Sequence, residues 1–253
     1  MSEHAAFHVG RLGPLGPVDA SASGGVVRER VTIDAAVGCR NLEQRVLDIA
    51  PGRTPSARNA ASEEVGYVVS GRGRLVAGSE TLELRPGCGM LIPPGVDHHL
   101  ENDGPQDLVV VSVRAPQPGV AEAAREAGRA SSTAAAVHED DEHPLPAGDD
   151  RTFKLLIDPR YGARHVTQFV GFIERSRAPM HTHTYEEVIF LLAGSGVVHA
   201  GDHRVPISAG SFVYLAPGTP HCLENAGTQT LRLLGVFSPA GSPADKREDA
   251  HGS

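Results

Sequence analysis

Residues 187–225 read EVIFLLAGSGVVHAGDHRVPISAGSFVYLAPGTPHCLEN, and residues 64–102 read EVGYVVSGRGRLVAGSETLELRPGCGMLIPPGVDHHLEN. The two stretches align without a gap, and roughly a third of the aligned positions are identical. The identical positions include a framework of glycines and the pair His98 and His221. A repeat of this length, with its glycines at fixed spacing, indicates that the chain carries a duplicated domain.

Each copy consists of short runs of β-branched and aliphatic residues bounded by Gly, Pro, Asn and Asp. The runs recur about every 8 to 12 residues, which is typical of all-β proteins. Gly78 in the first copy and Gly201 in the second lie between two such runs, where glycine supplies the positive φ that a tight hairpin requires. The sequence therefore predicts an all-β chain of two tandem barrels or jelly rolls.

The repeat and the composition around it predict five segments. The first barrel is expected over residues 26–115 and the second over residues 151–240, joined by an acidic, alanine-containing linker over residues 116–150. Residues 1–25 and 241–253 are polar or rich in Gly and Pro, so they are expected to be flexible unless they dock on a neighbour.

Composition narrows the classes of partner. The chain has 253 residues and a formal net charge of −8, and its basic residues are dispersed, which disfavours a nucleic acid or an anionic membrane as partner. No apolar run approaches the roughly 20 residues that span a bilayer. Three scattered cysteines without a Cys-x-x-Cys pair suit a reducing compartment. We expect a cytoplasmic protein with a small-molecule partner, and the sequence leaves a homodimer open.

Four residues of the second copy form a candidate metal site. His181, His183 and Glu187 share one parity, so in extended backbone their side chains project to the same face. The turn at Pro217-Gly218 then reverses the chain and presents His221. Three imidazoles and one carboxylate suit one divalent transition metal, with Fe or Mn favoured and Ni, Co or Zn also compatible, and they disfavour Mg or Ca.

Glu186 is the alternative to Glu187 as the carboxylate ligand. Strand parity favours Glu187, because Glu186 projects to the opposite face from His181 and His183. Glu187 also aligns with Glu64 at the start of the repeat.

These residues carry a family resemblance. HTHTYEEVIFLLAG resembles the first cupin motif and GSFVYLAPGTPHCLEN the second, with agreement at every ligand position. Two framework positions depart from the motifs: the glycine expected before His181 is not at its usual place, and Ala216 replaces a proline. The resemblance implies a bicupin, with a double-stranded β-helix in each half and the metal motifs intact only in the C-terminal half. It also implies that Glu187 can act as a catalytic proton acceptor.

The first copy retains Glu64 and His98 but lacks the paired histidines. The positions that match His181 and His183 fall on one of two pairs, depending on the register: Arg58 and Ala60, or Ala57 and Asn59. Neither pair contains a histidine, and two ligands rarely hold a transition metal, so the first barrel is predicted to be metal-free and structural.

Gln168 and Tyr214 lie in strand-like runs of the second copy and are predicted to reach the barrel interior as substrate-binding residues. The alternative for each is a core polar group with its hydrogen bonds satisfied.

A metal with open positions at the mouth of a barrel favours an enzyme. The leading hypothesis is a mononuclear non-haem metal oxidoreductase, a dioxygenase acting on a small organic acid, enediol or phenol. The second is a non-redox metal-dependent hydrolase, decarboxylase or isomerase, similar in architecture to ureidoglycine aminohydrolase. The third is a cupin that binds a small molecule without catalysis.

Overall fold

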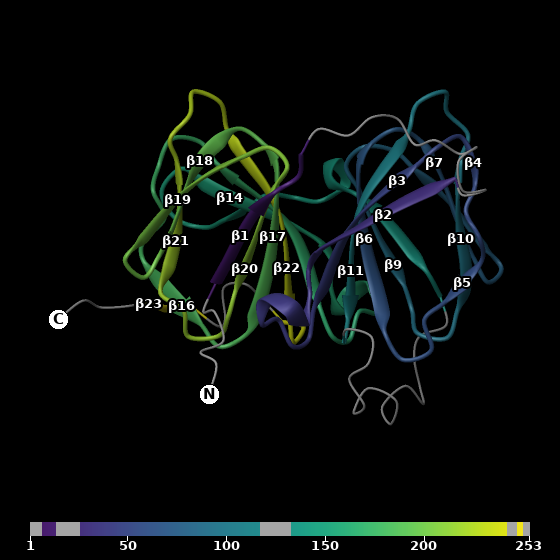
Figure 1. Cartoon of the computed structure of the whole chain (residues 1–253), viewed down its shortest axis with the longest axis horizontal. Helices are drawn as coiled ribbons and strands as arrows, with labels where there is room; N and C mark the ends of the chain where they lie inside the picture. Colours follow the sequence, from purple (N-terminus) through teal and green to yellow (C-terminus); the bar gives the residue numbers. More distant parts are fainter. Residues whose placement is uncertain (1–6, 14–25, 117–132, 242–246, 250–253) are drawn as a thin grey trace.

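The computed structural model describes residues 7–13, 26–116, 133–241 and 247–249. Two β-barrels lie side by side, the N-terminal one in blue and the C-terminal one in green and yellow (Figure 1). Within the described residues the helices are short 3-10 turns, at Ala35–Val37, Glu139–Asp141 and Pro159–Tyr161. None of the helices described here has the length and apolar character that crossing a membrane requires. The architecture confirms the predicted all-β fold of two tandem barrels.

The N-terminal barrel consists of two facing sheets. The larger has the order β12-β9-β6-β11-β3-β2, and the smaller has the order β4-β10-β7-β8, with β5 also paired to β10. The strands are β2 (Val27–Ile33), β3 (Glu43–Ile49), β4 (Gly52–Arg53), β5 (Ala57–Arg58), β6 (Glu63–Ser70), β7 (Gly73–Ala77), β8 (Glu80–Leu84), β9 (Cys88–Ile92), β10 (Asp97–Asn102), β11 (Leu108–Ala115) and β12 (Ala135–His138).

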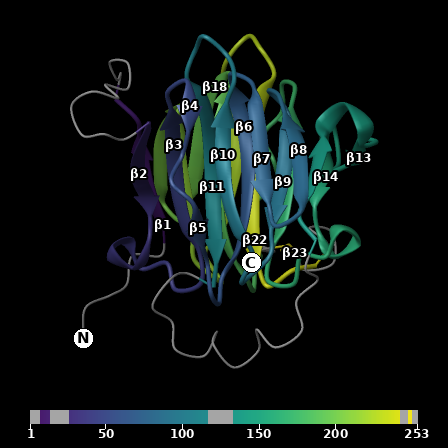
Figure 2. The same cartoon turned by 90° about the vertical axis from the view of Figure 1, so that its right-hand side faces the viewer.

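The C-terminal barrel repeats this arrangement with the sheets β1-β20-β17-β22-β15-β14-β13 and β19-β18-β21-β16-β23. Figure 2 shows β13 and β14 at the outer edge of the molecule. The strands are β1 (Phe7–Arg11), β13 (Leu145–Pro146), β14 (Arg151–Ile157), β15 (Thr167–Ile173), β16 (His181–His183), β17 (Glu186–Ala193), β18 (Ser195–Ala200), β19 (His203–Ser208), β20 (Ser211–Leu215), β21 (His221–Asn225), β22 (Leu231–Ser238) and β23 (Arg247–Asp249).

The two halves exchange strands. β1 precedes the N-terminal barrel in the chain but pairs antiparallel with β20 of the C-terminal barrel. β12 precedes the C-terminal barrel but pairs with β9 of the N-terminal barrel. Each exchanged strand covers a sheet edge that would otherwise expose unpaired backbone groups.

Part of the sequence assigned to the N-terminal segment, the linker and the tail is therefore ordered. β1 lies within residues 1–25, β12 and β13 lie within 116–150, and β23 lies within 241–253. β1, β12 and β23 pair with strands that are distant in sequence, so local composition alone did not reveal them, whereas β13 pairs with the adjacent β14. The remainder of these segments, residues 1–6, 14–25, 117–132, 242–246 and 250–253, lies outside the described residues.

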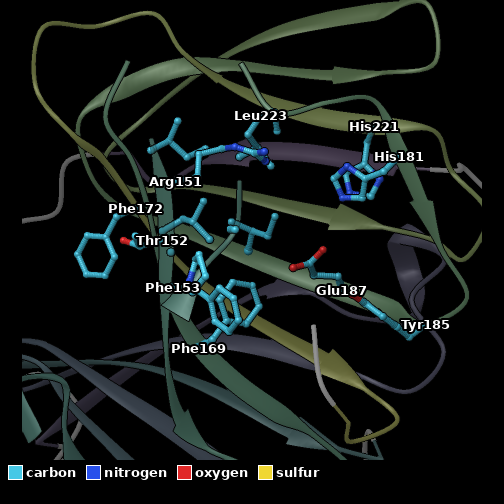
Figure 3. Close-up of a pocket in the computed structure, with 17 residues that line it drawn as sticks. Arg151, Thr152, Phe153, Phe169, Phe172, His181, Tyr185, Glu187, His221 and Leu223 are labelled. Atoms are coloured by element: carbon cyan, nitrogen blue, oxygen red, sulfur yellow. The ribbon is translucent and has the colours of Figure 1, made fainter. Parts of the chain in front are cut away.

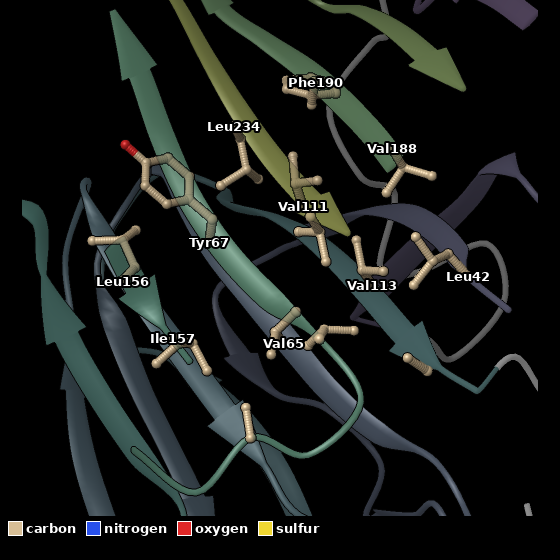
Figure 4. Close-up of a cluster of buried hydrophobic side chains, with 14 of the residues drawn as sticks. Leu42, Val65, Tyr67, Val111, Val113, Leu156, Ile157, Val188, Phe190 and Leu234 are labelled. Atoms are coloured by element: carbon tan, nitrogen blue, oxygen red, sulfur yellow. The ribbon is translucent and has the colours of Figure 1, made fainter. Parts of the chain in front are cut away.

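The largest apolar cluster lies between the two barrels (Figure 4). It joins Val65, Tyr67 and Val113 of the first half to Val188 and Leu234 of the second. Each barrel also encloses a separate interior cluster. The strands at the interface are therefore buried on both faces, with one face in the barrel and the other against the second half.

Two buried carboxylates, one from each half, accept hydrogen bonds from the backbone of the other half. Glu63 on β6 accepts backbone hydrogen bonds from residues 164–166 of the second half, at 2.8–3.0 Å. Glu186 on β17 accepts from the backbone of Arg40 at 2.8 Å and of Asn41 at 2.7 Å in the first half. Because such charge-assisted hydrogen bonds are short and strong, the two glutamates fix the orientation of the barrels.

Candidate metal centre

Three strands bring the candidate ligands together inside the C-terminal barrel. β16 provides His183, β17 provides Glu187, and β21 provides His221 immediately after the turn at Pro217-Gly218. One ligand atom from each of these residues lies within 4.8 Å of the others, and all three residues are buried. Within the described parts of the chain, they are the one group of three or more His, Cys, Asp or Glu residues with this geometry.

His181 lies at the edge of this group. It pairs directly with His221 across β16 and β21, and the centroids of the two imidazole rings are 4.4 Å apart. The His181 Nδ1 donates to the Pro179 carbonyl at 2.9 Å, and the His221 Nδ1 donates to the Thr219 carbonyl at 2.9 Å. Because each Nδ1 carries the proton, each Nε2 keeps its lone pair for a metal ion.

The protonation states also suit a metal. Burial, together with the neighbouring His181, lowers the pKa of His221 to about 4, so its imidazole is neutral at physiological pH. Burial opposes the ionisation of Glu187, but the hydrogen bond from His183 and the nearby imidazoles lower its pKa below the ordinary value. Neutral histidine and ionised carboxylate are the forms that bind a divalent cation.

The local geometry fits a metal ion as well. His183 Nε2 lies 3.1 Å from Glu187 Oε2. That separation matches two ligands placed at right angles around an ion with bonds of about 2.1 Å. Unlike His181 and His221, His183 has no hydrogen-bond partner at its buried Nδ1, so no partner at that atom fixes its tautomer. Tyr185 stacks on the His183 ring at 4.1 Å and 8° and holds its plane.

Glu186, the alternative carboxylate, points away from this centre. Besides its contacts with the first half, it accepts a hydrogen bond from the Tyr214 hydroxyl at 3.1 Å. The adjacent glutamates on β17 thus occupy opposite faces of the strand, as the alternation of side chains in extended backbone predicts.

Replacing Glu186 by alanine is expected to leave metal content unchanged and to lower the free energy of unfolding by about 1–3 kcal/mol, since the part-buried backbone donors of Arg40 and Asn41 lose their acceptor. Glu63→Ala is the matched control, because it removes the equivalent hydrogen bonds far from the metal ligands. Metal analysis and thermal unfolding of both variants test this. Loss of metal in Glu186→Ala alone would assign the carboxylate ligand to Glu186.

A cavity of about 150 Å³ opens beside the ligands. Glu187, His181 and His221 line one side of it, and Figure 3 shows these three residues across the cavity from Thr152 and Phe172. The remaining lining is mostly apolar and comprises Pro146, Ala147, Arg151, Phe153, Phe169, Gly171, Ile173, Ala178, Tyr185, Ile189, Leu223 and Leu233.

Gln168 and Tyr214 are not among the lining residues, which corrects the expectation that they contact substrate. The Gln168 amide donates to the Gly66 carbonyl of the first half at 3.1 Å, and Tyr214 donates to the Gly38 carbonyl at 3.1 Å. Both side chains lie on the outer faces of their strands, where the first barrel covers them. The residues next to them in the chain, Phe169 and Leu215, face the barrel interior instead.

The first barrel shows which of the two registers is correct. Ala57 pairs with His98 in the way that His181 pairs with His221. The Asn59 carbonyl accepts a hydrogen bond from the Gly95 N–H at 2.7 Å. In the same way, the His183 carbonyl accepts from the Gly218 N–H at 2.8 Å. Ala57 and Asn59 therefore occupy the two histidine positions.

An ion pair takes the place of the metal ligands in the first barrel. The Glu64 carboxylate accepts from Arg45 at 2.7 Å, from the Ser112 hydroxyl and from Asn59 at 2.8 Å. Burial alone would raise the pKa of Glu64, but Arg45 and these hydrogen bonds hold it below its ordinary value. In the second barrel Phe169 and Gly235 occupy the strand positions of Arg45 and Ser112, so Glu187 has no such partners there.

Two residues of the cavity lining with polar groups, Arg151 and Tyr185, were not identified from the sequence. Arg151 begins β14 and Tyr185 follows the His-x-His pair. A signal for Arg151 is present in the repeat: the position that matches it in the first half is Val27, and a cation that replaces an apolar residue on a barrel strand is unusual.

The model of the cupin domain matches residues 45–114 and again residues 169–237, together more than half of the chain. The chain belongs to the cupin family. Each match covers the central strands of one barrel, so the protein is a two-domain cupin, or bicupin.

Similar proteins support this architecture. The bicupin is 37% identical over 63 residues to an oxalate-binding protein from Thermotoga maritima, an alignment that covers 24% of this chain and 52% of that protein. It superposes on a variant of oxalate decarboxylase from Bacillus subtilis with a TM-score of 0.72 and 12% identity, covering 99% of this chain and 80% of the other. It superposes on a variant of salicylate 1,2-dioxygenase from Pseudoaminobacter salicylatoxidans, in complex with gentisate, with a TM-score of 0.69 and 13% identity, covering 94% and 83%. At these identities the structural likeness concerns the fold alone.

Proposed function

We propose that this bicupin is a metal-dependent enzyme, a mononuclear non-haem oxidoreductase of the dioxygenase type that acts on a small organic acid, enediol or phenol. The observation that carries the proposal is the convergence of His183, Glu187 and His221 within 4.8 Å, with His181 beside them, at the wall of a small cavity. His181, His183, Glu187 and His221 would hold the metal.

A divalent transition metal at this position would lower the pKa of a bound substrate hydroxyl and, when redox-active, transfer electrons to dioxygen. The protein residues do the remaining work. Glu187, ionised and facing the cavity, accepts the hydroxyl proton on its free carboxylate oxygen. The rings of Phe153 and Phe169 exclude water from the reacting groups and strengthen electrostatic interactions there.

Oxygen uptake tests this function. The protein is purified anaerobically, loaded with Fe(II) or Zn(II), and given a panel of small hydroxy acids, enediols and phenols. We expect oxygen consumption only by the iron form of the native chain and none by iron-treated His221→Ala. If no member of the panel supports oxygen uptake by the iron form, the dioxygenase assignment is wrong.

A non-redox reaction is the second candidate, a hydrolysis, decarboxylation or isomerisation in which the metal acts only as a Lewis acid. The likeness to oxalate decarboxylase and the match to an oxalate-binding protein favour testing it. Turnover that continues without oxygen and with redox-inert zinc would establish this candidate in place of the first.

A further inference from the structure

The cavity beside the candidate metal ligands contains one guanidinium. Arg151 lies among the apolar and aromatic residues of the lining, and its side chain is 6% exposed. Figure 3 shows Arg151 beside Leu223, away from the histidines and Glu187. The cavity thus has metal-binding groups at one side, aromatic walls formed by Phe153 and Phe169, and a fixed positive charge at another side.

A specific turn holds this arginine in place. Arg151 is the first residue of β14 and follows the turn of the β13–β14 hairpin. Its backbone N–H donates to the Gly148 carbonyl at 3.1 Å, and its carbonyl accepts from the Ala147 N–H at 2.9 Å. Gly148 has a φ of 88° and Asp149 a φ of 51°. A non-glycine residue such as Asp149 rarely adopts a positive φ, because this left-handed conformation costs energy. The turn therefore gives the backbone before Arg151 a defined path.

The first barrel shows that the fold itself does not require this charge. Val27 pairs with Ile49 as Arg151 pairs with Ile173, so Val27 occupies the matching position. The first barrel has a cavity of its own, which Val27 lines, and the charged side chains of its lining are Glu29, Arg45, Glu64 and Arg114. Arg45 and Glu64 form an ion pair there. The second barrel therefore lacks the internal ion pair and carries a cation at a position that is apolar in its counterpart.

We propose that Arg151 binds the carboxylate of a small, flat carboxylic acid whose other end reaches the metal ligands. The proposal rests on the proposed function and names its substrate class. A guanidinium pairs with a carboxylate through two parallel N–H donors. A cavity of about 150 Å³ lined by apolar and aromatic side chains holds one benzene-sized group. The substrate class is therefore a carboxylic acid with a body of about one six-membered ring.

The test compares an acid with its neutral isostere. Binding of 4-fluorobenzoate and 4-fluorobenzamide to the full chain, loaded with zinc, is measured by fluorine NMR titration. We expect the native chain to prefer the acid. In Arg151→Gln, acid binding is expected to weaken about 10- to 100-fold while amide binding stays unchanged. Arg204→Gln removes an exposed arginine on β19, outside the cavity, and is expected to bind both ligands like the native chain.

Three outcomes would overturn the proposal: no binding of either ligand to the native chain, equal affinity for acid and amide, or unchanged acid binding in Arg151→Gln. Because Arg151 is buried, Arg151→Lys is tested in parallel; it keeps the charge and is expected to retain part of the preference for the acid. Metal content is measured separately for every variant. A chain that binds no metal but binds the acid through Arg151 would refute the proposed function and leave this inference standing.

Discussion

Replacing His221 by alanine is expected to abolish metal binding. His221 is buried and supplies one of the three ligand atoms that converge within 4.8 Å, and its Nε2 is free to coordinate because Nδ1 donates to a carbonyl. Loss of a residue that only orients a ligand weakens metal binding about 10- to 100-fold, so loss of a ligand is expected to exceed that range. Metal content is measured by mass spectrometry on protein purified anaerobically after expression with added iron or manganese.

His98→Ala is the matched control for this experiment. His98 occupies the same position in the first barrel and makes the same hydrogen bond, from Nδ1 to the Val96 carbonyl at 3.0 Å. We expect His98→Ala to retain about one metal ion per chain, as the single complete donor set requires. Metal retained in His221→Ala, or lost equally in both variants, would contradict the proposed site.

Four substitutions in the first barrel are expected to create a second metal site. Ala57→His and Asn59→His supply the missing imidazoles, and Arg45→Phe with Ser112→Gly release the carboxylate of Glu64 from its ion pair. The metal content of the quadruple variant should rise to about two ions per chain, one for each complete donor set. Without metal, the unpaired buried Glu64 should cost about 3–5 kcal/mol of stability.

The double variant Ala57→His with Asn59→His tests the role of the ion pair. Arg45 still neutralises Glu64 in this variant, so metal binding to the first barrel should be at least about 10-fold weaker than in the quadruple variant. Metal titration followed by thermal unfolding distinguishes the two. If the double variant binds the second ion as tightly as the quadruple variant, the Arg45–Glu64 pair does not oppose metal binding at this position.

The repeat predicted the two barrels, and strand parity together with the turn at Pro217-Gly218 grouped His181, His183, Glu187 and His221. Strand parity also placed Glu186 on the face opposite Glu187, and Glu186 does point away from the metal centre. These features are readable because strand alternation and turn chemistry are local properties of the chain.

Strand parity did not predict which face of the strand Gln168 and Tyr214 occupy. It separates the two faces of a strand, but here both faces are buried, one in the barrel and one against the second half. A polar residue on such a strand fits either environment. The exchange of β1 and β12 was equally hidden, since those pairings join segments that are distant in sequence and depend on the assembled tertiary structure.

The exchange of β1 and β12 bears on how the two halves came to differ. In each half, one strand pairs with a sheet of the other half and one glutamate accepts hydrogen bonds from its backbone. The same contacts would form between two separate copies of a single-barrel ancestor. In such an ancestral homodimer every mutation appears twice, so a change that removes a metal ligand removes it from both subunits. Fusion into one chain ends this symmetry. One barrel could then acquire a stabilising ion pair while the other kept its ligands, and the chain could divide structural support and chemistry between its halves.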